Sequence, residues 1–166
     1  MIAHIRIVLD HKEDVFRDIE ISLDANLEEL HKIILDAFML STEEMASFYL
    51  TNEEWEQGEE IPLVSMQEGT HEMADMTVSS IFREPGSRLL YVQDFLIMWR
   101  FMVELEELKE DASQEELPFV ILSFGDMPHK APSVQFVSEA DDSNDPYGDV
   151  LDEFNEFEEF DEFGEY

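Results

Sequence analysis

The chain has 166 residues, no cysteine, and 42 acidic against 9 basic residues, which gives a formal net charge of −33 at pH 7. Its length favours a single domain, and the absence of cysteine excludes disulfides, thiolate zinc sites and cysteine nucleophiles. The charge repels phosphate backbones and anionic lipid heads, so we expect no direct binding to nucleic acid and no membrane binding.

Two alternating segments open the chain. Residues 2–9 place Ile5, Ile7 and Leu9 on one face, and residues 19–23 repeat the alternation after a polar turn. A period of two residues is typical of half-buried strands, so the two segments predict a β-hairpin.

A helix is predicted to follow the hairpin. Asn26 and Glu29 form a capping-box pattern at its start, in which each side chain accepts a hydrogen bond from the backbone of the other residue. The apolar residues that follow recur at spacings of three and four, so one stripe should face the core. These residues are Leu27, Leu30, Ile34, Ala37 and Phe38. Residues 41–44 predict a short further turn of helix.

The middle of the chain contains several shorter elements. Strands are predicted at 47–50, 88–95 and 119–124, a loop or irregular strand at 55–62, a loop at 65–74, and a short helix at 77–82. Residues 99–108 alternate and predict a strand paired with 88–95, but a helix over 97–110 fits the spacing of Met98, Met102 and Leu105 as well.

This order of elements does not alternate strand with helix. It predicts an α+β fold with a mostly antiparallel, curved sheet, in which the N-terminal β-hairpin is followed by one main helix packed on the sheet. We expect residues 1–137 to form the domain and residues 138–166 to form an acidic tail.

Two segments together resemble a known family. Residues 27–38, with the pair Leu30 and His31 early in the helix, resemble the leading helix of the plasmid pRi ORF-three-like family, also described as insertion-element passenger TnpR-like proteins. Tyr91, Asp94-Phe95 and Trp99 match a second segment of that family, although Gln93, Leu96 and Ile97 depart from it. The resemblance covers about residues 1–125 and implies the fold. It implies no activity, because the family has none established.

The matched segment 91–99 also holds the main candidate site, formed by Tyr91, Asp94 and Trp99. A carboxylate within an apolar strand has the setting in which a general base is tuned. The alternative is that Asp94 caps a turn or pairs with Arg88 or Arg100, and we favour this structural role.

His31 lies beside the apolar stripe of the predicted helix, where it could be a ligand or a proton shuttle. We favour a packing histidine, because no second ligand stands four residues away. Residues 71–75 and 141–152 match zinc-protease and calcium-loop patterns only in part. We therefore predict no metal, no cofactor and no catalytic residue.

The acidic tail carries aromatic residues at strict intervals of three: Phe154, Phe157, Phe160, Phe163 and Tyr166. Acidic segments studded with aromatic residues are suited to binding basic, grooved proteins. The alternatives are that these rings dock on their own domain or that the tail maintains solubility.

These observations lead to ranked hypotheses about function. The first is a non-enzymatic, cytoplasmic interaction module that binds a protein with a basic surface through acidic surfaces and the tail. The alternative is a small-molecule-binding protein or an enzyme with a site near Asp94. A third reading, imitation of nucleic-acid charge, rests on the net charge alone.

Overall fold

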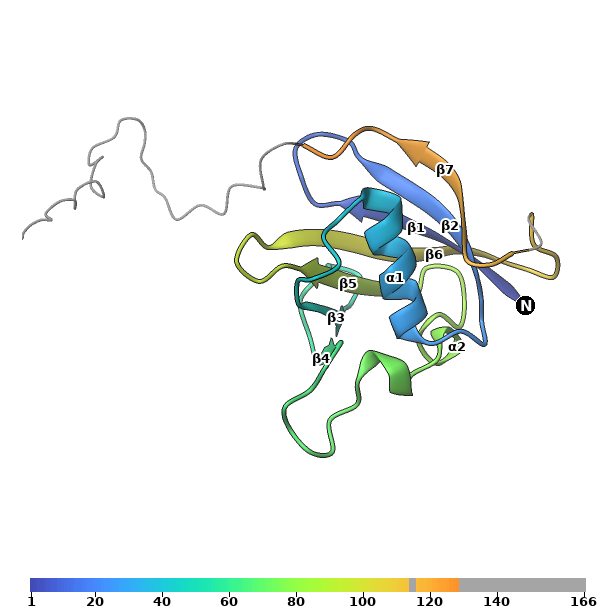
Figure 1. The fold of residues 1–166 in the computed structure, drawn as a ribbon. Helices are drawn as coiled ribbons and strands as arrows, with labels where there is room; N and C mark the ends of the chain where they lie inside the picture. Colours follow the sequence, from blue (N-terminus) through green and yellow to red (C-terminus); the bar gives the residue numbers. More distant parts are fainter. Residues whose placement is uncertain (114–115, 129–166) are drawn as a thin grey trace, which may run out of the picture. The chain divides into compact units, whose positions relative to one another are not determined.

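The computed structural model describes residues 1–113 and 116–128, which form one antiparallel seven-stranded sheet with helices beside it (Figure 1). The strand order is β4-β3-β5-β6-β1-β2-β7. The strands are β1 (Ile2–Leu9), β2 (Phe16–Ser22), β3 (Ala46–Leu50), β4 (Glu60–Pro62), β5 (Arg88–Gln93), β6 (Trp99–Lys109) and β7 (Phe119–Phe124). The helices are α1 (Leu27–Phe38), α2 (Val78–Ile81) and a 3₁₀ turn, η1 (Met73–Asp75). The α+β fold, the hairpin and the single main helix are confirmed.

The start of α1 follows the predicted capping box. The Asn26 side chain accepts from the Glu29 amide at 2.9 Å, and the Glu29 carboxylate accepts from the Asn26 amide at 3.3 Å. The helix ends at Met39, whose φ of 55° is left-handed, and the Leu40 amide bonds back to the Leu35 carbonyl at 2.9 Å. The further helical turn predicted at 41–44 is therefore wrong, because the chain has already left the helix.

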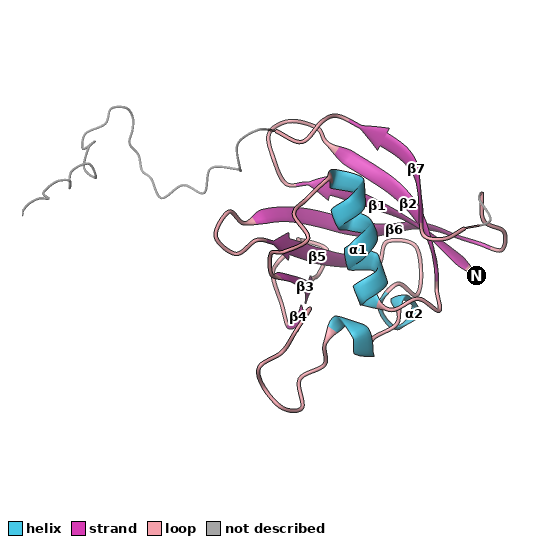
Figure 2. Cartoon of the chain, viewed as in Figure 1, coloured by secondary structure: helices cyan, strands magenta, loops and turns pink. Residues whose placement is uncertain are grey.

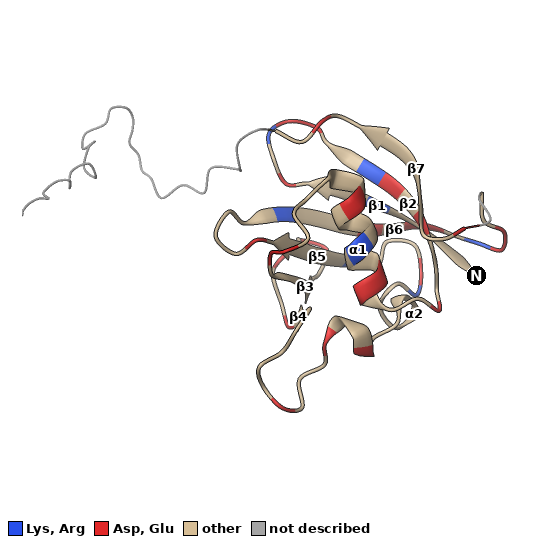
Figure 3. Ribbon diagram, viewed as in Figure 1, with Lys and Arg blue, Asp and Glu red and all other residues tan. Residues whose placement is uncertain are grey.

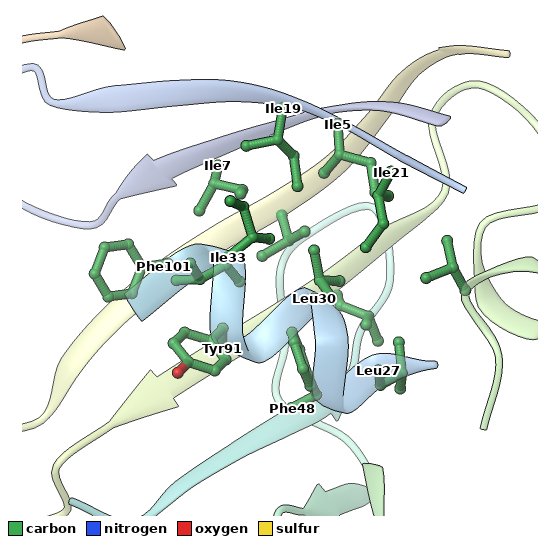
Figure 4. Close-up of a cluster of buried hydrophobic side chains, with 14 of the residues drawn as sticks. Ile5, Ile7, Ile19, Ile21, Leu27, Leu30, Ile33, Phe48, Tyr91 and Phe101 are labelled. Carbon is green, nitrogen blue, oxygen red and sulfur yellow. The ribbon is translucent and has the colours of Figure 1, made fainter. Parts of the chain in front are cut away.

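The core lies between α1 and the inner face of the sheet (Figure 4). Residues at alternate positions of β1, β2 and β6 pack there against the apolar stripe of α1, and burying each large side chain contributes about 1.5–3 kcal/mol. The buried residues include Ile5, Ile7, Ile19, Ile21, Leu30, Ile34, Phe38, Phe48, Phe101 and Val103. Neither helix of the described residues has a long enough apolar run to cross a membrane.

The segment that fitted both a strand and a helix is the long strand β6. It pairs with β1 on one side, where Leu105 lies opposite Ile5, and with β5 on the other, where Phe101 lies opposite Tyr91. Pairing on both sides satisfies its backbone, so the alternation decides the structure rather than the competing helical spacing. The preceding strand β5 ends at Gln93, two residues earlier than predicted.

Basic residues on the outer face of the sheet are held by the chain's own carboxylates. The guanidinium of Arg6 donates twice to Asp18, at 2.7 and 3.0 Å, and His4 contacts the same carboxylate at 2.9 Å. Lys109 forms an ion pair with Glu20 across the sheet. Figure 3 shows carboxylates spread over α1 and the loops, among far fewer basic residues.

Glu20 is excluded from solvent and has three donors around its carboxylate. These are the ammonium of Lys109 and the amide and hydroxyl of Ser113, the latter two at 2.7 Å. Burial alone would raise the pKa of Glu20, but these hydrogen bonds outweigh burial and hold the pKa at about 2. Glu20 therefore fastens the end of β6 and the segment after it to β2.

We predict that Glu20 gives stability that depends on pH in a defined window. Its pKa in the folded state is about 2 and its ordinary value is 4.5, so its contribution is complete above 4.5 and is lost as the pH falls toward 2. Urea unfolding of the wild type and Glu20→Gln should show a gap in the free energy of unfolding at neutral pH that closes across this window. A gap independent of pH would contradict this role.

Candidate functional site

The structure brings two of the predicted site residues together and separates the other two. His31 on α1 contacts Tyr91 on β5, whereas Asp94 and Trp99 lie at the two ends of the loop between β5 and β6. The four residues therefore occupy two places: a buried pair and a loop.

The buried pair joins α1 to the centre of the sheet. Nδ1 of His31 lies 2.7 Å from the hydroxyl of Tyr91, and both side chains are buried. Burial lowers the pKa of His31 and raises the pKa of Tyr91, so burial favours the neutral form of both groups. Figure 4 shows Tyr91 within the core beside Phe48. The pair links α1 to β5 inside the core, and the buried His31 side chain has a hydrogen-bond partner there.

Asp94 organises the loop of residues 94–98. Its Oδ1 accepts hydrogen bonds from the amides of Leu96 and Ile97, both at 3.1 Å. Its carbonyl accepts from the Met98 amide at 2.5 Å, and its own amide donates to the Met45 carbonyl at 2.7 Å. One residue thus makes four hydrogen bonds that hold the loop closed. Its carboxylate caps a turn, as the favoured structural interpretation of the sequence expected.

Two residues of this loop have left-handed backbone angles without being glycine. Asp94 has φ 68° and Met98 has φ 66°, a conformation that is uncommon for any residue except glycine, asparagine and aspartate. The hydrogen bonds of Asp94 compensate for this strain. The loop thus has a defined backbone conformation, which the four hydrogen bonds of Asp94 support.

The side chains that this loop presents are apolar and face solvent. Phe95, Leu96, Ile97 and Met98 are all exposed, and Leu96 is 95% exposed. Met45, whose carbonyl holds Asp94, is also exposed. A contiguous run of exposed apolar residues lowers the solubility of a protein, and such surfaces are typical of interaction sites. We call these five residues the apolar end.

The segment between α1 and β3 passes beside the loop, as the hydrogen bond from the Gln93 side chain to the Ser41 carbonyl at 2.8 Å shows (Figure 2). Where this segment leaves α1, the surface has an open hollow of about 350 Å³. The hollow is lined by Lys32, Leu35, Asp36, Met39, Leu40 and Thr42, and thus by none of Tyr91, Asp94 and Trp99.

Acidic residues border the apolar end where Met45 joins it. Glu43 and Glu44 directly precede Met45 and are exposed. Arg100, which directly follows Trp99, forms an ion pair with Asp10 of the loop between β1 and β2 at 3.3 Å. This pair balances its own charges, so the acidic border of the apolar end consists of Glu43 and Glu44.

The sequence singled out Asp94 as a candidate site residue but not the apolar residues that follow it. The predicted strand 88–95 included Phe95, whereas Leu96 lay between the predicted elements, and Ile97 and Met98 belonged to the alternative helix. The sequence feature that could have predicted this loop is Asp94 itself, which directly precedes the apolar run, because Asp favours turns and left-handed backbone conformations. The predicted tail residues, from Phe154 to Tyr166, lie outside the described residues.

Comparison with known proteins identifies a family. A family model described as "Plasmid pRiA4b ORF-3-like protein" matches residues 1–161. The chain belongs to this family. No curated protein matches it. Membership of the plasmid pRiA4b ORF-3-like family confirms the resemblance carried by residues 27–38 and 91–99.

A solved structure shares the fold of this family member. It is the crystal structure of a protein of unknown function, MM3350, from Methanosarcina mazei Go1, with a TM-score of 0.61 and 18% sequence identity. The match covers 74% of this chain and 68% of that chain. At this identity the similarity concerns the fold alone.

We predict that the Asp94 carboxylate protects the amides of the loop. In Asp94→Ala the amides of Leu96 and Ile97 should exchange with solvent about tenfold faster or more, since a hydrogen bond to a charged group contributes about 1.5–3 kcal/mol. Asp94→Asn is the matched control, because it retains an oxygen acceptor and tolerates the left-handed backbone. Hydrogen exchange followed by NMR measures both. Equal protection in Asp94→Ala and the wild type would show that the carboxylate does not hold the loop.

Proposed function

We propose that this protein is a non-enzymatic, cytoplasmic interaction module that binds a protein with a basic surface, and that the apolar end is its contact site. The observation that carries the proposal is the Asp94-held loop, which exposes four consecutive apolar side chains, with exposed Glu43 and Glu44 beside Met45. Such a surface favours a partner segment that combines apolar and basic side chains.

The distribution of charge supports a basic partner. On the sheet, Arg6, Arg88 and Lys109 each form ion pairs with carboxylates of the same chain. Their charges are largely cancelled where they lie, so the remaining carboxylates dominate the field around the molecule. A positive partner would be steered toward this surface, and its binding should weaken as salt is added.

The alternative, a small-molecule site or an enzyme near Asp94, has less support from the geometry. The carboxylate of Asp94 is engaged with two backbone amides, and Tyr91 is enclosed in the core. A ligand site needs a concave surface with convergent polar groups. The loop next to Asp94 instead presents apolar side chains outward, which suits contact with another protein.

We predict that capture of the partner depends on Leu96. Leu96→Ser should weaken capture of a partner from native lysate, because it removes the most exposed side chain of the apolar end. Met66→Ser is the control, since Met66 is 96% exposed and lies outside the apolar end. The proposal is wrong if the two variants capture the same proteins in the same amounts.

A pair of charge reversals tests the acidic border in the same assay. Glu43→Lys with Glu44→Lys should reduce capture, whereas Glu53→Lys with Glu54→Lys, two exposed acidic residues on another loop, should reduce it less. Replacing the five tail rings with serine in the full chain tests the tail separately. Loss of capture in that variant alone would assign recognition to the tail rather than to the apolar end.

A further inference from the structure

The two edge strands of the described sheet are protected to very different degrees. At one edge, β4 has three residues and includes Glu60 and Pro62. At the other, β7 has six residues, Phe-Val-Ile-Leu-Ser-Phe, with neither a charge nor a proline. Charge, proline and short length are the means by which proteins prevent edge strands from pairing with other chains. The β4 edge uses all three of these features. The β7 edge uses none of the three, although a β-bulge interrupts its pairing with β2 between Asp18 and Ile19.

The side chains of β7 add an apolar surface to this open edge. Phe119, Leu122 and Phe124 are exposed, and the ring of Phe124 stacks on Phe16 of β2 with 5.3 Å between centroids. Figure 1 shows β7 at the margin of the sheet next to β2. A strand added here would gain backbone hydrogen bonds and apolar contacts together.

We propose that two copies of this chain associate through their β7 strands, paired antiparallel about a two-fold axis. Such an interface is self-complementary, because each copy offers the same edge to the other. With the axis at Leu122, Leu122 of one copy lies opposite Leu122 of the second copy, with both side chains on the same face of the joined sheet. Side chains paired across strands contribute to the stability of a sheet.

Charge favours a second copy as the occupant of this edge. β7 offers no carboxylate to a basic partner, so it is unsuited to the partner expected at the apolar end. Two copies with a net charge of −33 each repel one another, and an uncharged strand is where they can meet without opposing carboxylates. Exposed Glu116 and Asp126 flank the strand, so the association should be weak at low salt.

The proposal is independent of the interaction with a basic protein and has the opposite dependence on salt. Raising NaCl from about 0.1 M to about 1 M shortens the screening length from about 10 Å to about 3 Å. Screening reduces repulsion between the two copies, so added salt should promote self-association, while it should weaken binding to a basic partner. Failure of one proposal therefore leaves the other intact.

Sedimentation equilibrium of the full chain over a concentration series tests the self-association. The average mass should move from monomer toward dimer as salt is raised, and Leu122→Lys should abolish the shift by placing a charge on the strand. Val64→Lys is the control, because Val64 is 52% exposed and Leu122 is 47% exposed. A mass that stays monomeric at high salt, or a shift that Leu122→Lys retains, would overturn the proposal.

Disulfide cross-linking tests the same pairing of β7 strands without introducing a charge into the strand. The chain has no cysteine, so Leu122→Cys introduces a single thiol close to the proposed axis. On oxidation by copper phenanthroline, two thiols release two protons to solvent, pass two electrons to two Cu(II) ions and form one disulfide. Leu122→Cys should give a dimer much faster than Val64→Cys does. Equal rates for the two variants would count against pairing through β7.

Discussion

The packing of α1 against the inner face of the sheet is the contact on which the rest of this structure depends. Its apolar stripe covers the alternating residues of β1, β2 and β6, and the hydrogen bond between His31 and Tyr91 holds it over the centre of the sheet. Because α1 ends at Met39, the chain must return past the end of β5 to begin β3. That return places Met45 where its carbonyl can hold Asp94, so the candidate site follows from the position of the helix.

Asp94 turns a short connection into a defined surface. Without its carboxylate, the amides of Leu96 and Ile97 would lose their acceptor within the loop. The backbone conformation that exposes the four apolar side chains would then be less stable. With it, the loop is held before any partner arrives, which reduces the entropy lost on binding. In the proposed function, the acidic border favours the approach of basic partners, because charge steers association while apolar contact supplies affinity. The proposal that the partner offers a basic, partly apolar segment rests on these two features together.

Elements that depend on local interactions could be predicted from the sequence, whereas those that depend on contacts between distant residues could not. The capping box of Asn26 and Glu29 spans three residues, and alternation in residues 2–9 describes one strand, so both could be predicted. The choice between strand and helix for residues 99–109 depended on pairing with β1, about a hundred residues away. The predicted strand 88–95 included Asp94, although the strand ends one residue before it. The hydrogen bond from the Asp94 amide to the Met45 carbonyl joins residues 49 positions apart, so no local pattern could reveal it. The meeting of His31 with Tyr91 was unpredictable for the same reason.

Site-specific photo-crosslinking tests the central claim most directly. A benzoylphenylalanine residue placed at position 96 of the full chain, in cells, reports what touches the apolar end, and the same residue at position 66 reports an exposed site outside it. The account predicts a discrete crosslinked protein with a basic surface from position 96, absent or much weaker from position 66. No crosslink at position 96, or the same products from both positions, would contradict the claim that the Asp94-held loop is a contact site.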